Sequence, residues 1–262
     1  MMNSANPFSL NGKTAVVAGA SRGIGQAIAA ALARAGARTI LASRSLEKLA
    51  AIALELRAEG LQAEAMELDI ASHDSRQRFA SELPDTDILI NVAGTNIRRN
   101  FTDYTPEEYS FLLQTNLTGI VELTQAVGAK MIARGKGGKV VMIGSLSCLM
   151  GMPYISVYTL TKSALAGLAR ALAAEWGRHG IQVNCIAPGF ILTDLNRKMW
   201  EPPEMHAWLK GAQADPRPGT PEDIAPLAVF LSSPGSDYIT GQLIAADGGC
   251  STTQIWPFTP QP

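Results

Sequence analysis

Short apolar or β-branched runs alternate along this chain with longer stretches of helical pattern, and this alternation limits the folds that are open to it. The clear runs cover residues 14–17, 39–41, 88–90, 140–143, 183–186 and 243–245, with a weaker one at 64–68. Strands that alternate with helices pair in parallel and are covered by helices on both faces. The sequence therefore predicts an α/β fold with a doubly wound parallel sheet of about seven strands.

Helix beginnings and one irregular stretch mark the organisation of the chain. Thr105 and Thr220 each precede a proline and then two acidic residues, which is typical of a helix N-terminus. No linker or repeat interrupts the series, so residues 1–262 are expected to form a single domain. The irregular stretch is 193–218, with two tryptophans and four prolines. Long segments of this kind are often lids, and we expect this one to cover the substrate.

The composition argues against several classes of function. The 22 lysines and arginines nearly balance the 23 acidic residues, so no net basic charge would attract nucleic acid or an anionic membrane. The N-terminus does not resemble a signal peptide, and no apolar stretch reaches the roughly 20 residues of a spanning helix. Cys148, Cys185 and Cys250 lack metal-ligand spacing with the histidines, so no metal site is expected. We expect a cytoplasmic protein that acts on a small molecule.

A glycine-rich segment directly follows the first predicted strand. It carries glycines at 19, 23 and 25, immediately before an alanine-rich helical pattern. Glycines at this junction let backbone N–H groups and the positive end of the helix approach a pyrophosphate. Such glycines also serve any tight strand-to-helix turn, but their place at the first junction of an alternating chain favours a dinucleotide. The expected cofactor contacts in this segment are Gly19, Ser21, Arg22, Gly23, Ile24 and Gly25.

The end of the second predicted strand distinguishes between the two nicotinamide dinucleotides. An acid there would bind the adenosine ribose and repel a 2′-phosphate, whereas this chain has Ser43 followed by Arg44. With Arg22, these residues make a pocket suited to phosphate, because guanidinium groups bind phosphate through charge-assisted bonds. Either arginine alone could be a solvated surface charge. Their joint placement beside a missing acid favours NADP(H).

The side chains that could carry the chemistry follow the fifth predicted strand. Ser145 stands at the end of that strand, while Tyr158 and Lys162 lie four residues apart on a predicted helix and share one face. A nearby ammonium favours the ionised form of a phenol, which lets Tyr158 exchange a proton with the substrate. The Ser145 hydroxyl can hold the substrate oxygen at the carboxyl edge of the sheet. A lone Tyr-x-x-x-Lys pair is common, but its order after Ser145 and the glycine loop predicts an oxidoreductase.

With these motifs, the chain resembles the short-chain dehydrogenases/reductases over nearly its whole length. Further matches are the segment 91–94, Asn116, the pair Pro188-Gly189 with Thr193, and the segment 247–249. The resemblance implies a Rossmann-type fold and a homotetramer built on the helices leading from Pro106 and Tyr154. It also implies a catalytic tetrad in which the helix of Asn116 presents a main-chain carbonyl to a water next to Lys162. A purely structural asparagine is the alternative. The tetrad is Asn116, Ser145, Tyr158 and Lys162.

The resemblance also extends the expected cofactor site beyond the glycine loop. It implies that Lys162 holds the nicotinamide ribose, that Asp69 contacts the adenine, and that the nicotinamide lies beside the segment after the sixth strand. Two departures from the family pattern, Ala18 for a threonine and Val92 for a second asparagine, put the rigidity of the loop after the fourth strand in question. The further expected cofactor contacts are Asp69, Ile70, Asn91, Ala93, Gly94, Tyr158, Lys162, Pro188, Gly189, Ile191 and Thr193.

The segments 93–99, 143–147 and 188–196 are similar to those of the gluconate 5-dehydrogenase-like subgroup of this family. That subgroup has an arginine at the place of Arg98, which could clamp a substrate carboxylate. Arg98 or Arg99 could instead solvate the loop or pair across a subunit interface. The resemblance implies interconversion of an alcohol and a ketone on a sugar acid such as gluconate, with Arg98, Ser145 and Tyr158 contacting the substrate.

Other functions stay open at this point. A less polar ketone would suit a pocket lined by methionines and tryptophans, for which the candidates are Met150, Met152, Trp200 and Trp208. A 3-oxoacyl-thioester reductase would need basic residues to dock an acyl carrier, and no cluster is obvious beyond Arg98-Arg99 and the segment 130–139. A non-catalytic NADP(H)-binding regulator is the alternative from another class, and the intact tetrad argues against it.

Overall fold

The computed structural model describes residues 6–194 and 196–255, and in it all seven expected strands pair in parallel in one sheet. The strands are β1 (Thr14–Ala18), β2 (Arg38–Ser43), β3 (Ala63–Glu67), β4 (Ile88–Asn91), β5 (Gly138–Ile143), β6 (Ile181–Pro188) and β7 (Leu243–Ala246). Their spatial order is β3-β2-β1-β4-β5-β6-β7. The chain therefore builds the sheet outward from β1 to one edge and then from β4 to the other. This order confirms the predicted doubly wound α/β fold.

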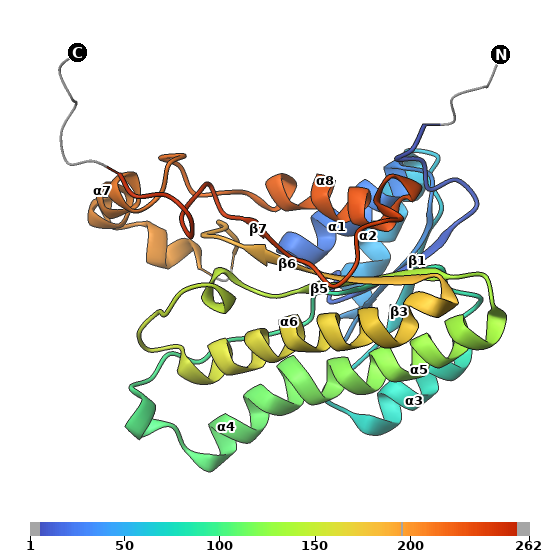
Figure 1. Cartoon of the computed structure of the whole chain (residues 1–262), viewed down its shortest axis with the longest axis horizontal. Coiled ribbons are helices and arrows are strands. Elements are labelled where there is room, and N and C mark those ends of the chain that lie inside the picture. Colours follow the sequence, from blue (N-terminus) through green and yellow to red (C-terminus); the bar gives the residue numbers. More distant parts are fainter. Residues whose placement is uncertain (1–5, 195, 256–262) are drawn as a thin grey trace.

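Helices cover both faces of the sheet (Figure 1). One face is covered by α1 (Gly23–Arg34), α2 (Leu46–Ala58) and α8 (Pro221–Ser232), and the other by α3 (His73–Glu82), α5 (Gly119–Arg134) and α6 (Ser156–Trp176). Neighbouring residues of β1 contribute to opposite cores, since Val17 packs beneath the first helix layer and Val16 beneath the second. A central parallel strand is buried on both sides, which explains its continuous apolar run.

The two predicted helix beginnings are confirmed. In α4 (Pro106–Leu113), the Glu108 N–H donates to Thr105 Oγ1 at 3.2 Å, and the Thr105 N–H donates to the Glu108 carboxylate at 3.3 Å. In α8, the Thr220 N–H donates to Asp223 Oδ2 at 2.7 Å. These reciprocal bonds satisfy N–H groups that have no partner within the helix.

The remaining elements lie mostly at the carboxyl edge of the sheet. They are η1 (Phe101–Asp103), the π-helical turn η2 (Gln114–Thr118), η3 (Leu146–Cys148), η4 (Gly177–His179), η5 (Arg197–Trp200), α7 (Pro203–Ala212) and η6 (Pro234–Ser236). The segment expected to be irregular, 193–218, thus contains η5 and α7, and Figure 1 shows α7 beyond the ends of β6 and β7. In the described part of the chain, no helix is long and apolar enough to cross a membrane.

Candidate active site

The glycine loop between β1 and α1 is shaped to lie close to other backbone. Gly19 has a φ of 100°, which side-chain-bearing residues rarely adopt, and a Cβ there would come within 2.6 Å of the Ala93 nitrogen. A Cβ on Gly23 would come within 3.3 Å of Thr193 Cγ2. The loop therefore meets the segments after β4 and β6, as the cofactor site requires. The Arg22 side chain does not cap α1, so this helix N-terminus fits a pyrophosphate.

The loop after β4 is held by main-chain bonds. The N–H groups of Val92 and Ala93 both donate to the Ala18 carbonyl, at 2.9 and 2.8 Å. These bonds need no side chain, so the two departures from the family pattern do not leave the loop unfastened. The Asn91 amide donates to Thr124 Oγ1 on α5 at 2.9 Å. Its amide nitrogen is thus bound to the helix layer, while its Oδ1 is buried without a partner among the described residues.

The expected site for the adenosine end of the cofactor lies after β2 and β3. Ser43 Oγ accepts a hydrogen bond from the Ser45 N–H at 3.1 Å, and Arg44 beside it is exposed, as is Arg22. Asp69 Oδ1 accepts from the Ala71 N–H at 3.0 Å, which shapes the turn after β3. Ile70 is buried against Gly119 at the start of α5. The residues expected at the adenosine end of the cofactor thus include two exposed guanidinium groups, those of Arg22 and Arg44.

Asn116 joins the loop after β4 to the helix that carries the other candidate catalytic side chains. Its amide accepts from the Thr95 N–H and donates to the Thr95 carbonyl, both at 2.8 Å. It also donates to Thr161 Oγ1 on α6 at 3.3 Å. Asn116 lies in the π-helical turn η2 and is fully buried. Its side chain therefore fixes the Thr95 backbone and does not bond to the backbone of its own helix, as the purely structural alternative would have it.

Lys162 lies at the centre of this arrangement. Its ammonium donates to the Ile143 carbonyl at the end of β5, at 2.8 Å, and lies 5.8 Å from the centre of the Tyr158 ring. A Cβ on Gly94 would be 3.1 Å from Lys162 Nζ and 3.5 Å from Asn116 Oδ1. Gly94 thus leaves a gap beside both polar groups. Lys162 is nearly inaccessible, and burial lowers its pKa to about 8.

Tyr158 differs from the expectation in its ionisation. Burial raises the pKa of its phenol above the ordinary value, while hydrogen bonding from Ser145 acts in the opposite direction. The expected lowering by Lys162 is not found, since burial is the dominant effect and the Lys162 ammonium donates to the Ile143 main-chain carbonyl. A protonated phenol near neutral pH is the form that can give a proton to a ketone oxygen. The Ser145 hydroxyl, which is the hydrogen-bond partner of Tyr158, also accepts a hydrogen bond from the Ser147 N–H at 3.1 Å.

The two adjacent arginines after this loop have different surroundings. Arg99 makes paired bonds to the Glu108 carboxylate at 2.7 and 3.1 Å. Arg98 is exposed, and its guanidinium donates to the Met199 sulfur in η5 at 3.2 Å. The charge of Arg99 is therefore neutralised by a carboxylate, whereas Arg98 contacts an uncharged thioether.

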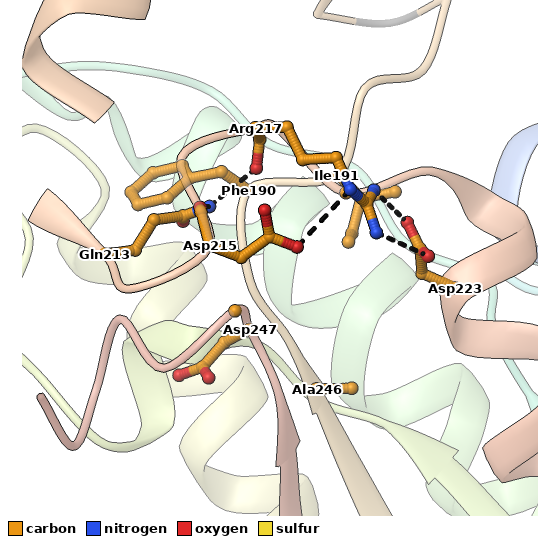
Figure 2. A pocket seen from close by; sticks show the side chains of 10 residues that line it. Phe190, Ile191, Gln213, Asp215, Arg217, Asp223, Ala246 and Asp247 are labelled. Atoms are coloured by element: carbon orange, nitrogen blue, oxygen red, sulfur yellow. Dashed lines mark hydrogen bonds and ion pairs between the residues drawn. The ribbon is translucent and has the colours of Figure 1, made fainter. Parts of the chain in front are cut away.

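Both ends of the segment 193–218 are fastened to the core. On the first side, the Leu192 N–H donates to the Gly219 carbonyl at 2.8 Å, and the Gly219 N–H donates to the Phe190 carbonyl at 2.9 Å. On the second, Arg217 lies between Asp215 and Asp223, as Figure 2 shows, and binds Asp223 at 2.7 and 3.0 Å. A cavity of about 210 Å³ lies where the two ends of this segment meet the core. It is lined in part by Phe190, Ile191, Gln213, Ala246 and Asp247.

The aromatic residues of this segment pack on one another. Trp200 and Trp208 both meet Phe190 edge-on, with ring centres 5.9 and 5.1 Å apart. Trp200 is buried, whereas Trp208 and Met150 are exposed. The cluster centred on Phe190 thus stabilises η5 and α7 against the end of β6. The interpretation of Trp200 as a packing residue fits this arrangement better than a pocket wall.

Comparisons with known proteins agree with this geometry. A family model described as enoyl-(acyl carrier protein) reductase matches residues 19–251. A gluconate 5-dehydrogenase from Gluconobacter oxydans is 36% identical over 250 residues, which are 94% of this chain and 97% of that protein. The chain belongs to the short-chain dehydrogenase/reductase family. It is accordingly an enzyme that interconverts alcohols and ketones.

Two further members of the family show the range of its relatives. A tropinone reductase homolog from Arabidopsis thaliana is 38% identical over 92% of this chain and 93% of that protein. The crystal structure of a gluconate 5-dehydrogenase from Burkholderia cenocepacia, in complex with NADP and tartrate, superposes with a TM-score of 0.89. It is 35% identical, over 94% of this chain and 98% of that one.

Several residues that shape this dehydrogenase/reductase site were not predicted. Thr95 and Thr161 bind Asn116, and Met199 binds Arg98, although these partners are 21, 45 and 101 positions apart. No local pattern could indicate such contacts. Gln213 was missed as well, and it donates to the carbonyls of Asp215 and Arg217 at the root of the segment 193–218.

The lowered pKa of Lys162 gives the stability of the enzyme a defined pH dependence. Between about pH 8 and the unfolded-state pKa of about 10.4, the unfolded chain binds a proton at this lysine and the folded chain does not. The free energy of unfolding therefore rises with pH across this window because of Lys162. We predict that wild type gains about 2 to 3 kcal/mol relative to Lys162→Met between pH 7.5 and 10.5. Urea unfolding of both proteins measures the difference, and a constant difference would contradict the prediction.

Proposed function

We propose that this chain is an NADP(H)-dependent oxidoreductase that interconverts a secondary alcohol and a ketone on a sugar acid such as gluconate and 5-ketogluconate. The support from relatives is that the Gluconobacter protein is a gluconate 5-dehydrogenase and the Burkholderia structure holds NADP and tartrate. The observation that carries the proposal is Arg98, an exposed guanidinium four residues after Gly94, which borders Lys162. Reduction is monitored directly as oxidation of NADPH with a panel of sugar-acid ketones, simple diketones and acyl thioesters.

The site fits a dinucleotide at three places. The turn at Gly19 and Gly23 would bring the uncapped end of α1 to the pyrophosphate, and Arg22, Ser43 and Arg44 would hold the 2′-phosphate. Thr193 borders the same loop and would face the nicotinamide half. NADP(H), when bound, supplies the hydride that passes to or from the substrate carbon.

The side chains of this chain would manage the proton and the substrate oxygen. Tyr158, which burial keeps protonated, would donate to the ketone oxygen, while the Ser145 hydroxyl holds that oxygen in place. The Lys162 ammonium would bind the nicotinamide ribose and stabilise the phenolate that the proton transfer leaves behind. Asn116 would keep Thr95 and the neighbouring loop fixed during this exchange.

Removing the guanidinium of Arg98 should affect acidic substrates selectively. We predict that Arg98→Ala lowers kcat/KM for 5-ketogluconate by roughly ten- to thirtyfold, because charge-assisted bonds contribute about 1.5 to 3 kcal/mol and this one is partly screened by water. Reduction of a neutral diketone should change little. Equal losses on both substrates would show that Arg98 supports the loop and would remove the residue-level argument for a sugar acid.

Reduction of 3-oxoacyl thioesters is the second candidate, and a relative of solved structure, a 3-oxoacyl (acyl-carrier-protein) reductase from Agrobacterium tumefaciens, favours it. The charged side chains of the protein surface give little support to docking of an acyl carrier. Of the four cations in 130–139, Lys130 donates to the Ala80 carbonyl, Arg134 pairs with Asp87 and Lys139 pairs with Asp237, while Lys136 is exposed. Three of the four are occupied within the chain, so this segment does not present a basic patch to an acidic carrier. The thioester arm of the substrate panel distinguishes the two candidates.

The segment 193–218 would act as the substrate lid, since η5 and α7 sit beyond the sheet edge while both ends of the segment are fastened. Hydrogen exchange with and without NADPH tests this role. A homotetramer is proposed from the family resemblance and from exposed apolar side chains on α4 and α6, namely Tyr109, Phe111 and Leu160. Light scattering gives the mass in solution, and a monomer would contradict this assembly.

A further inference from the structure

The surroundings of Arg98 suggest that a residue of the substrate lid competes with the substrate. Arg98 and Arg99 are neighbours on one loop, yet Arg99 is neutralised by Glu108, whereas Arg98 donates to the sulfur of Met199. A thioether is a weak acceptor, and a carboxylate forms a charge-assisted bond that is roughly twice as strong as a neutral one. A carboxylate that reaches Arg98 can therefore replace the sulfur as its partner.

Met199 is held in this position by its own segment. Its N–H donates to the Asn196 carbonyl at 2.9 Å, and the Asn196 amide donates to the Ile191 carbonyl at 2.8 Å. The next residue, Trp200, is buried edge-on against Phe190. The backbone that carries this sulfur thus belongs to an anchored turn, which keeps position 199 within reach of Arg98.

We propose that the side chain at position 199 determines how strongly this enzyme prefers acidic ketones to neutral ones, by competing with the substrate carboxylate for the Arg98 guanidinium. The proposal rests on the proposed function in one respect, namely that Arg98 binds the carboxylate. The thioether competes weakly, so that acids bind at a small cost, and neutral ketones never need to displace it. A stronger acceptor at 199 would turn the same position into an internal inhibitor of acid binding.

Two substitutions change the competition in opposite directions. Met199→Leu keeps the apolar volume but removes the acceptor, and it should raise the ratio of kcat/KM for 5-ketogluconate to that for 2,3-butanedione by about two- to fivefold. Met199→Glu places a carboxylate against Arg98 and cancels its charge, and it should lower the ratio by roughly tenfold, less at high salt. Turnover of 2,3-butanedione reports whether each variant is folded and active.

The pairing of position 199 with Arg98 is tested by a double-mutant cycle. In an Arg98→Ala background, both Met199 substitutions should leave the ratio unchanged, because the shared partner is gone. Arg99→Ala is the matched control, since it removes the neighbouring cation but should not alter the ratio. Effects of Met199→Glu that persist without Arg98, or that fall equally on acidic and neutral ketones, would overturn the proposal.

Tartrate inhibition of 2,3-butanedione reduction separates this inference from the proposed function. If tartrate inhibits and its inhibition constant follows the Met199 and Arg98 variants as above, the competition holds even if no sugar acid is turned over. If acid turnover depends on Arg98 but not on residue 199, the proposed function stands and the inference is wrong. If the wild type neither turns over acidic ketones nor binds tartrate, both are wrong.

Discussion

Replacing Tyr158 by phenylalanine should lower kcat for ketone reduction by about a hundred- to ten-thousandfold, the range typical for loss of a positioned proton donor. The hydroxyl is the group that acts on the reacting oxygen, and burial raises its pKa so that it carries a proton near neutrality. The ring lies among residues of η3 and α6, and phenylalanine preserves that packing. The Kd for NADPH, measured by fluorescence titration, should therefore stay within about twofold of wild type.

Two further variants, Ser145→Ala and Lys162→Met, distinguish loss of the proton donor from loss of other functions of the site. Loss of Ser145 removes the second group at the substrate oxygen, so kcat should fall while NADPH still binds. Loss of Lys162 should weaken NADPH as well, because this ammonium would hold the nicotinamide ribose beside Gly94. A Tyr158→Phe enzyme that turns over at the wild-type rate would show that another group supplies the proton, and the assignment of the tetrad would fail.

The strands could be predicted from the sequence because a strand that is buried on both faces consists of a continuous run of apolar residues. Every position from Ala15 to Ala18 in β1 is buried, and such a run is visible without a structure. β3 was the weakest prediction for the same reason. As an edge strand it carries exposed glutamates at positions 64 and 67, so fewer apolar residues report its presence.

The segment 193–218, which we propose as the substrate lid, was predicted as irregular although it contains a ten-residue helix, α7. A signal for that helix was available. Pro203 at its first turn and Glu204 after it repeat the pattern seen at Pro106 and Pro221, where the beginnings were predicted. α7 differs in having Pro202 at the cap where the other two helices have threonine. Four prolines in one segment favoured a loop, but none of them lies in the interior of α7, since Pro202 and Pro203 stand at its beginning and Pro216 and Pro218 follow its end.

In the candidate site, contacts between residues close in sequence could be predicted, and contacts between distant residues could not. Tyr158 and Lys162 are one helical turn apart, so their shared face follows from spacing alone. The role of Asn116 does not, because its amide binds the backbone of Thr95 across a gap of 21 residues. The direction of the Tyr158 pKa shift could not be predicted from the sequence either, since it depends mainly on burial and on the hydrogen bond with Ser145.

Replacing Ser43 at the end of β2 together with Arg44 after it should reverse the preference between NADPH and NADH. We predict that the double variant Ser43→Asp with Arg44→Ala raises the ratio of the NADPH to the NADH dissociation constant by roughly a hundred- to thousandfold. Arg44→Ala alone should account for about tenfold, since it removes one charge-assisted partner of the 2′-phosphate at an exposed position. The aspartate contributes the rest, because it repels that phosphate and accepts from the ribose hydroxyls of NADH.

Salt and a second arginine provide the controls for this reversal. The Arg44 contribution should shrink as ionic strength rises from 0.05 to about 0.5 M, because exposed charges are screened over roughly a Debye length. Arg22→Ala should weaken NADPH more than NADH as well, since Arg22 is the other arginine expected at the 2′-phosphate and stands exposed at the start of α1. If the wild type binds both dinucleotides equally and the double variant changes neither, then Arg22 and Arg44 are solvated surface charges, and the choice of cofactor is made elsewhere in the site.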